Sequence, residues 1–204
     1  MKLIILTPET FLPGEAEILN RLFEAGIFTL HLRKPGSSQE QLRPLLNAIL
    51  PEFHSNIVLH DHFPLTNEYK VKGVHLNRRN PEPPNVPGLS VSKSCHSFQE
   101  VKDSATADYV FLSPIFDSIS KSGYHRAFSH EELIAARDEG IINKKVIALG
   151  GIDETSISMV RDYGFGGIAL LGGFWIAPDT KLLRKRLKLF LDLLTNNNPE
   201  GTRT

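Results

Sequence analysis

Residues 146–173 read VIALGGIDETSISMVRDYGFGGIALLGG and contain one full unit of the pattern that decides the fold. Two short apolar runs, 146–149 and 167–171, are each followed by glycines, and the segment 153–163 between them has helical spacing of apolar residues. A strand, a helix and a second strand in this order form a βαβ unit with parallel strands. The stretch therefore predicts part of a parallel sheet covered by helices.

The same pattern recurs along the whole chain. The apolar runs expected to be strands are 3–6, 28–32, 57–60, 73–76, 89–92, 109–112, 146–149 and 167–171. Runs of this kind, without polar alternation, indicate parallel strands with both faces buried. Eight of them in a chain of 204 residues predict an α/β fold, a single-domain (β/α)8 TIM barrel over residues 1–195.

The segments between these runs predict the helices. The expected helices are 15–25, 39–50, 97–103, 129–139, 153–163 and 179–194. Pro44 must lie near the first turn of the second helix or bend it, and the proline-rich segment 77–88 predicts a shortened or irregular fourth helix. The tail 196–204 is expected to be disordered.

Composition excludes several classes of function. Lys+Arg and Asp+Glu both total 23, so no basic excess favours binding to nucleic acid or to an anionic membrane. Cys95 is the only cysteine, which excludes an internal disulfide, and we expect it to be a small core residue. The charge-free stretch 163–178 is rich in glycine and shorter than the roughly 20 apolar residues of a membrane helix. We expect a soluble cytoplasmic protein.

Polar and glycine residues follow several predicted strands, where barrel enzymes place their active sites. The glycine pairs at Gly150, Gly151 and at Gly172, Gly173 would let backbone N–H groups approach a phosphate closely. The alternative is that these glycines only make tight turns. Arg33 and Lys121 are cationic groups expected at the same mouth, which suggests a second and larger anion.

Two further residues suggest chemistry at this end of the barrel. Asp61, with Asn80 after the next strand, would offer oxygen ligands to Mg²⁺, although a hydrogen bond between Asp61 and a neighbouring loop or His60 is at least an equal alternative. His96, beside Ser94, suits proton transfer near neutral pH, and the alternative is a buried structural histidine.

Taken together, these motifs resemble those of the thiamine phosphate synthase/TenI superfamily, in the same order over nearly the whole chain. They are HLR at 31–33, GVHL at 73–76, SCHS at 94–97, ADYVFLSPIF at 107–116, SISK at 118–121, ALGGI at 148–152 and GGIALLGG at 166–173. The set is far more specific than any single motif in it. The resemblance implies a barrel that binds hydroxyethylthiazole phosphate.

The synthases of this superfamily join that thiazole to hydroxymethylpyrimidine pyrophosphate with Mg²⁺ and release pyrophosphate. The resemblance implies that Arg33, Lys121 and Ser94 hold the pyrophosphate and that Asp61 holds the metal. It also implies that the substrates are contacted by His31, Ser118, Ser120, Gly150, Gly151, Leu171 and Gly172. The partners are then small phosphorylated thiazole and pyrimidine molecules.

Several residues depart from the synthase pattern. His31 replaces a glutamine, His60 an asparagine, Pro35 a lysine and Asn80 the second metal carboxylate, and whether Lys34 replaces the lysine is open. HLR and SCHS resemble the TenI branch, whose thiazole tautomerases use a histidine matching His96.

We therefore expect thiamine phosphate synthase chemistry first, a thiazole tautomerase second, and a non-catalytic thiazole phosphate-binding protein third. Apolar residues after the last strand, Phe174, Trp175 and Ile176, would cover either a neighbour in a homo-oligomer or the barrel itself.

Overall fold

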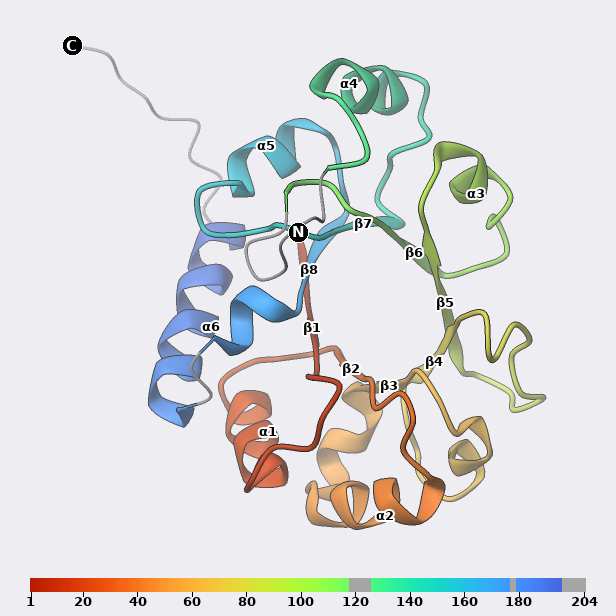
Figure 1. Ribbon diagram of the computed structural model, residues 1–204, viewed down its shortest axis with the longest axis vertical. Coiled ribbons are helices and arrows are strands. Elements are labelled where there is room, and N and C mark those ends of the chain that lie inside the picture. Colours follow the sequence, from red (N-terminus) through yellow and green to blue (C-terminus); the bar gives the residue numbers. More distant parts are fainter. Residues whose placement is uncertain (118–125, 177–178, 196–204) are drawn as a thin grey trace.

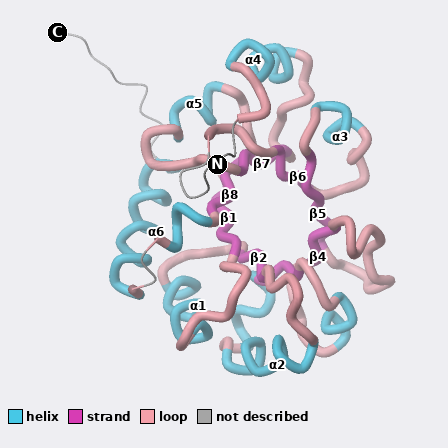
Figure 2. Tube along the Cα trace, in the orientation of Figure 1, coloured by secondary structure: helices cyan, strands magenta, loops and turns pink. Residues whose placement is uncertain are grey.

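A computed structural model describes residues 1–117, 126–176 and 179–195 of the chain. Eight parallel strands form a closed barrel in sequence order, and helices surround it (Figures 1 and 2). The strands are β1 (Lys2–Leu6), β2 (Leu30–Leu32), β3 (Ile57–Leu59), β4 (Gly73–Leu76), β5 (Ser90–Cys95), β6 (Tyr109–Leu112), β7 (Val146–Leu149) and β8 (Gly167–Leu170). The predicted (β/α)8 barrel is confirmed.

The helices alternate with the strands, but the ring is incomplete. The α-helices are α1 (Glu15–Glu24), α2 (Gln39–Ala48), α3 (Phe98–Lys102), α4 (His130–Asp138), α5 (Ile157–Asp162) and α6 (Thr180–Thr195). Between β3 and β4 there is only the 3₁₀ turn η2 (Phe63–Asn67), and residues 77–89 contain no helix, as their prolines predict. The connection from β4 to β5 is therefore made by a loop without a helix.

Local sequence explains where the helices begin. Ser38 and Ser129 both form capping boxes, in which the serine Oγ accepts from the backbone three residues on and Gln41 or Glu132 accepts in return. Ser97 caps α3 in the same way through the N–H of Glu100. Pro44 lies inside α2.

The core has two layers. The larger one lies between the barrel and the helices, and the smaller one lies inside the barrel. The inner apolar cluster comes from β1, β6, β7 and β8, and consists of Ile4, Leu6, Tyr109, Phe111, Ile147 and Ala169. The strands β2, β4 and β5 instead contribute the buried polar residues His31, His75 and Ser92. The interior is thus divided into an apolar half and a polar half.

The structure corrects several predicted boundaries. β2 begins at Leu30, and Phe28, placed at the start of that strand by its hydrophobicity, is 73% exposed. β5 continues to Cys95 instead of ending at Ser92, so Ser94 lies inside the strand. On α6, Leu183, Leu187, Phe190 and Leu194 face the core, whereas Leu182 is exposed.

The structure also tests the predictions for Cys95, for the apolar residues after β8 and for membrane helices. Cys95 is a free, buried cysteine, as predicted, and burial raises the pKa of its thiol. Phe174 and Trp175 belong to the core of this chain, whereas Ile176 is 63% exposed. No helix within the described ranges is long and apolar enough to cross a membrane. The predicted disordered tail 196–204 lies outside the described residues.

Candidate active site

The carboxyl ends of all strands lie at one end of the barrel, here called the mouth, because every strand is parallel to its neighbours. Arg33 directly follows β2, and Asp61 is the second residue after β3. Ser94 and His96 lie at the end of β5. The structure therefore brings these predicted residues to one mouth. Lys121, Ser118 and Ser120 lie outside the described residues.

Arg33 is anchored on the loop after β1. Its Nη1 lies 2.8 Å from Oε1 of Glu9, and its backbone N–H donates to Oγ1 of Thr7 at 2.9 Å. The hydroxyl of Thr7 donates in turn to the carbonyl of Arg33 at 3.2 Å. These contacts fix the backbone that carries the guanidinium at the mouth.

Lys34 is turned away from the mouth. Its ammonium donates to Oε1 of Glu15 at 2.7 Å and to the carbonyls of Pro8 and Thr10 at 2.9 and 2.8 Å. Burial lowers the pKa of Lys34, and the carboxylate of Glu15 acts in the opposite direction. Because all three N–H donors are used, Lys34 does not replace the lysine that is missing at Pro35.

Asp61 is held by the loop after β4. Its Oδ1 accepts from Nε and Nη2 of Arg79 at 3.1 and 2.8 Å, and from Nδ2 of Asn80 at 3.3 Å. Asn77 shapes this loop, because its Oδ1 accepts from the N–H groups of Arg79 and Asn80 while its Nδ2 donates to the carbonyl of His60. The predicted alternative is what the structure contains, because Asp61 accepts hydrogen bonds from a neighbouring loop.

These contacts do not fit the Mg²⁺ site that the family resemblance implies. Mg²⁺ demands oxygen ligands in near-octahedral geometry. Asn80 directs its amide N–H₂ group, and not its oxygen, toward Asp61, while the guanidinium of Arg79 already neutralises that carboxylate and would repel a dication. Of the two carboxylate oxygens of Asp61, Oδ2 is buried and has no hydrogen-bond partner among the described residues.

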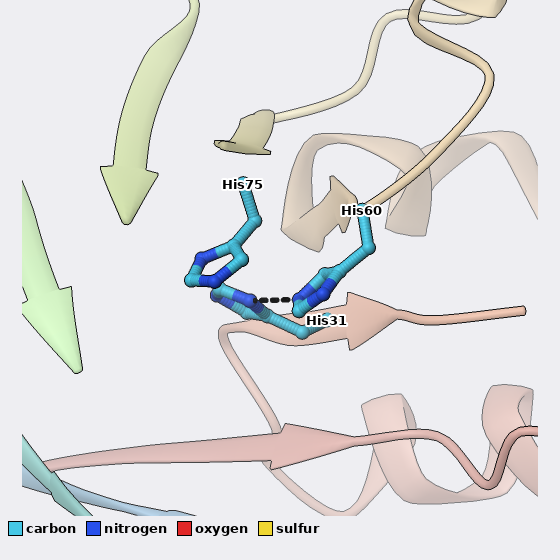
Figure 3. Close-up of side chains that lie close together, drawn as sticks. All are labelled: His31, His60 and His75. Carbon is cyan, nitrogen blue, oxygen red and sulfur yellow. Dashed lines mark hydrogen bonds between the residues drawn. The ribbon is translucent and has the colours of Figure 1, made fainter. Parts of the chain in front are cut away.

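Three histidines form a cluster below the mouth, on the polar side of the barrel interior (Figure 3). His31 Nδ1 and His60 Nε2 share a hydrogen bond of 2.8 Å, and His31 Nε2 lies 2.6 Å from the hydroxyl of Tyr109. His75 contacts Oγ of Ser92 through Nδ1 and Oγ of Ser94 through Nε2, both at 2.9 Å.

The histidine cluster has the ligand type of a transition-metal site, since nitrogens of all three rings lie within 4.8 Å of one another. However, the rings of His60 and His75 are stacked, with centroids 4.2 Å apart and planes 18° apart, so their in-plane lone pairs cannot converge on one ion. Five of the six ring nitrogens also already make hydrogen bonds. The cluster is therefore a hydrogen-bonded network and does not have the geometry of a metal centre.

Burial also sets the charge of this cluster. It lowers the pKa of His75 to about 3, and lowers the pKa values of His31 and His60 well below 6.5. All three rings are therefore neutral at pH 7. Sequence reasoning placed His31 at the mouth and did not single out His75. Both are lone polar residues in apolar strands, and this is the signal that could have drawn attention to them.

His96 lies exposed at the mouth, so the alternative of a buried structural histidine is wrong. Its Nδ1 lies 3.0 Å from the carbonyl oxygen of Ser113, which can only accept, so Nδ1 carries the proton. The backbone N–H of His96 donates to Oε2 of Glu100 at 2.7 Å. In the neutral ring, the free lone pair therefore belongs to Nε2, and this nitrogen is available as a base.

The glycine turns lie above β7 and β8. Gly150 and Gly151 have φ values of +97° and +66°, and a Cβ on Gly151 would lie 2.3 Å from the carbonyl oxygen of Asp117. The tight-turn interpretation thus applies to this pair. In the described part of the chain, no acceptor pairs with the amide N–H groups of Gly150, Gly151 or Gly172, which begins η3 (Gly172–Trp175). The same amides are available to an anion.

Fold and mouth together define a class: a (β/α)8 barrel whose loops beyond the strands gather guanidinium, imidazole and glycine amide groups. The model of the thiamine monophosphate synthase (TMP-TENI) family matches residues 3–174. The chain belongs to this family.

Individual relatives agree with this assignment. The chain is 28% identical to the thiamine-phosphate synthase of Koribacter versatilis, over 92% of this chain and 90% of that protein. The thiamine phosphate pyrophosphorylase from Bacteroides thetaiotaomicron superposes with a TM-score of 0.87 at 38% identity, covering 97% of this chain and 100% of that one. A second structure, the thiamine phosphate pyrophosphorylase from Pyrococcus furiosus, has a TM-score of 0.71 at 21% identity, covers 95% and 96% of the two chains, and shows the fold alone.

Proposed function

We propose that this chain is a thiamine phosphate synthase, a transferase that joins hydroxymethylpyrimidine pyrophosphate to hydroxyethylthiazole phosphate and releases pyrophosphate. Family membership over residues 3–174 supports the reaction class. The observation that carries the proposal is the presence of two anion-binding elements at one mouth: the cationic loops after β2 and β4, and the free glycine amides after β7 and β8. A reaction between two phosphorylated molecules needs both.

The two elements suit the two substrates. Arg33, Lys121 and Ser94 would hold the pyrophosphate of the pyrimidine, and Gly150, Gly151, Leu171 and Gly172 would cradle the phosphate of the thiazole. Helix and turn N–H groups that lack a partner bind phosphate oxygens well.

Charge neutralisation of the leaving group drives the proposed reaction. The C–O bond to the pyrophosphate breaks, its electron pair leaves with the oxygen, and the thiazole nitrogen forms the new C–N bond with the pyrimidine cation. The guanidinium of Arg33 and the ammonium of Lys121 would stabilise the negative charge that develops on the departing oxygen. No step is assigned to Mg²⁺, because the described contacts of Asp61 do not fit it.

The test is to incubate the protein with both substrates and to measure thiamine phosphate and pyrophosphate formation together. We expect equal amounts of the two products, and a loss of about 10²–10³ in kcat/KM for Arg33→Ala, the usual effect of removing one group that stabilises developing charge. Lys181→Ala, on the exposed face of α6, is the matched control and should leave kcat/KM unchanged. A folded protein that forms neither product contradicts the proposal.

A thiazole tautomerase is the second candidate, favoured by the orientation of His96. The carbonyl of Ser113 leaves Nε2 as the basic nitrogen, which would move a proton on the thiazole phosphate. This function predicts isomerisation of thiazole phosphate without the pyrimidine substrate, lost in His96→Ala and retained in the control His130→Ala. Binding of thiazole phosphate with thermal stabilisation and no turnover would instead indicate a non-catalytic binding protein.

A further inference from the structure

We infer that Arg79 takes the place of a divalent cation at the mouth, so that this barrel holds the diphosphate group of its substrate without a bound metal. The inference rests on the proposed function for the identity of the diphosphate. Its structural basis is the misfit between Mg²⁺ and the contacts of Asp61, which concern only residues of the described loops after β3 and β4.

Several hydrogen bonds hold Arg79 and Asp61 in contact. Two guanidinium nitrogens share Oδ1 of Asp61, and Asn77 fixes the backbone N–H of Arg79 at 2.9 Å. The side chain of Asp61 is only 10% exposed, whereas that of Arg79 is 56% exposed. The guanidinium therefore covers the carboxylate and faces solvent at the mouth, and its Nη1 has no acceptor among the described residues.

The charges explain why no cation is needed. One carboxylate and one guanidinium cancel each other, as two carboxylates and one Mg²⁺ would, and Asn80 adds no charge. A dication bound to Oδ2 of Asp61 would add two positive charges beside an arginine already in place. Arg78 directly precedes Arg79 and adds a further positive charge to this loop.

Arg33 and Arg79 lie on the loops that follow β2 and β4, which are the two neighbours of β3 in the barrel. These two loops therefore flank the segment after β3 that carries His60 and Asp61. A diphosphate above this segment would meet two planar donor groups, which bind phosphate oxygens bidentately and with charge assistance.

In the proposed reaction, the arginines replace the metal only as an electrostatic partner. The C–O bond of the pyrimidine substrate breaks and its electrons remain on the pyrophosphate oxygen, which accepts hydrogen bonds from the guanidinium groups. The thiazole nitrogen supplies the electron pair of the new C–N bond. No oxidant, reductant or proton donor is required.

The first experiment measures binding, not activity. Inorganic pyrophosphate is titrated calorimetrically into the full chain in EDTA, and Mn²⁺ is titrated separately and followed by electron paramagnetic resonance. We expect pyrophosphate to bind in EDTA, at least tenfold more weakly in Arg79→Ala, and as tightly as wild type in the exposed control Arg184→Ala. We expect no stoichiometric Mn²⁺ binding. Stoichiometric Mn²⁺ binding that is lost in Asp61→Asn, or pyrophosphate binding that requires Mg²⁺, overturns the inference.

A second variant replaces the arginine and the amide beside Asp61 with carboxylates. The double change Arg79→Glu and Asn80→Asp supplies two further carboxylates around Asp61, and circular dichroism checks that the variant is folded. We expect it to bind one Mn²⁺ and to need Mg²⁺ for pyrophosphate binding. A folded double variant that binds Mn²⁺ no better than wild type contradicts the inference.

The outcomes separate this inference from the proposed function. A protein that binds pyrophosphate in EDTA but makes no thiamine phosphate fails only the proposed function. A protein that makes thiamine phosphate only with Mg²⁺ fails only the inference about Arg79.

Discussion

The two halves of the barrel interior are equally buried but are held together differently. Side chains of β1, β6, β7 and β8, such as Ile4 and Ile147, fill one half with apolar volume. The other half is filled by His31, His60 and His75, with nearly every ring nitrogen hydrogen-bonded. The cationic loops lie above the polar half and the glycine amides above the apolar half. The division of the core therefore continues into the two anion-binding elements of the mouth.

The largest effect is expected where the two halves meet. Phe111 is fully buried, with its ring 4.8 Å from that of His31 and 4.9 Å from that of His75. Phe111→Ala should lower the free energy of unfolding by about 3–5 kcal/mol, through lost burial and the cavity left behind. Urea titration measures it, with the exposed Phe28→Ala as control at about 0.5 kcal/mol or less. A loss below about 1.5 kcal/mol would mean that the two halves do not pack as one core.

The rim of the apolar half depends on close backbone approach. Gly151→Ala places a Cβ 2.3 Å from the carbonyl oxygen of Asp117 at a positive φ, and should cost about 2–4 kcal/mol. Gly36→Ala is the matched control, because Gly36 has a φ of +79° with no atom within 4 Å of the added Cβ, and should cost only about 1–2 kcal/mol. Equal losses of melting temperature in both variants would show that crowding at Gly151 is unimportant.

Of the two halves of the interior, the polar half contains the histidines and should respond to acid. The pKa of His75 is about 3 in the folded protein and near 6.5 when unfolded, so the unfolded state binds more protons below pH 6.5 and stability falls as the pH drops toward 3. Between pH 7 and pH 5, His75 alone should account for a loss of about 2 kcal/mol. Urea unfolding across this range measures it. His75→Gln should flatten the profile and the exposed His130→Gln should not; an unchanged slope in His75→Gln contradicts the prediction.

The smallest effect tests a single hydrogen bond within the polar half. Tyr109→Phe removes the hydroxyl 2.6 Å from Nε2 of His31 and leaves that nitrogen buried without a partner, at a cost of about 1–2 kcal/mol. Tyr69→Phe removes an exposed hydrogen bond to Asn47 and should cost less than about 1 kcal/mol. If the two variants unfold at the same urea concentration, the buried network does not contribute more than a surface contact.

The strands and most helices could be predicted because buried parallel strands are short apolar runs separated by helical patterns. The polar interior could not, since strands that are buried on both faces have no alternation to tell the inner face from the outer one. His31 and His75 could therefore not be assigned to one layer until the barrel closed.

The contacts of the mouth depended on loop geometry. Asp61 was predicted as a metal ligand, but its pairing with Arg79 depends on the turn shaped by Asn77. Likewise, Glu15 begins α1 and Lys34 follows β2, so the path of the chain through both elements brings them together, and neither residue alone predicts the pair. Charge and spacing indicated which residues reach the mouth, and only the backbone course showed which of them neutralise one another.

The single tryptophan of the chain gives the protein a built-in optical probe. Trp175 lies in η3, three residues after Gly172, and its indole N–H donates to the carbonyl of Leu6 at 2.7 Å. All indole fluorescence therefore arises beside one of the two phosphate elements and none beside the other. An emission change upon addition of thiazole phosphate, but not of pyrophosphate, would report which element is filled without any label.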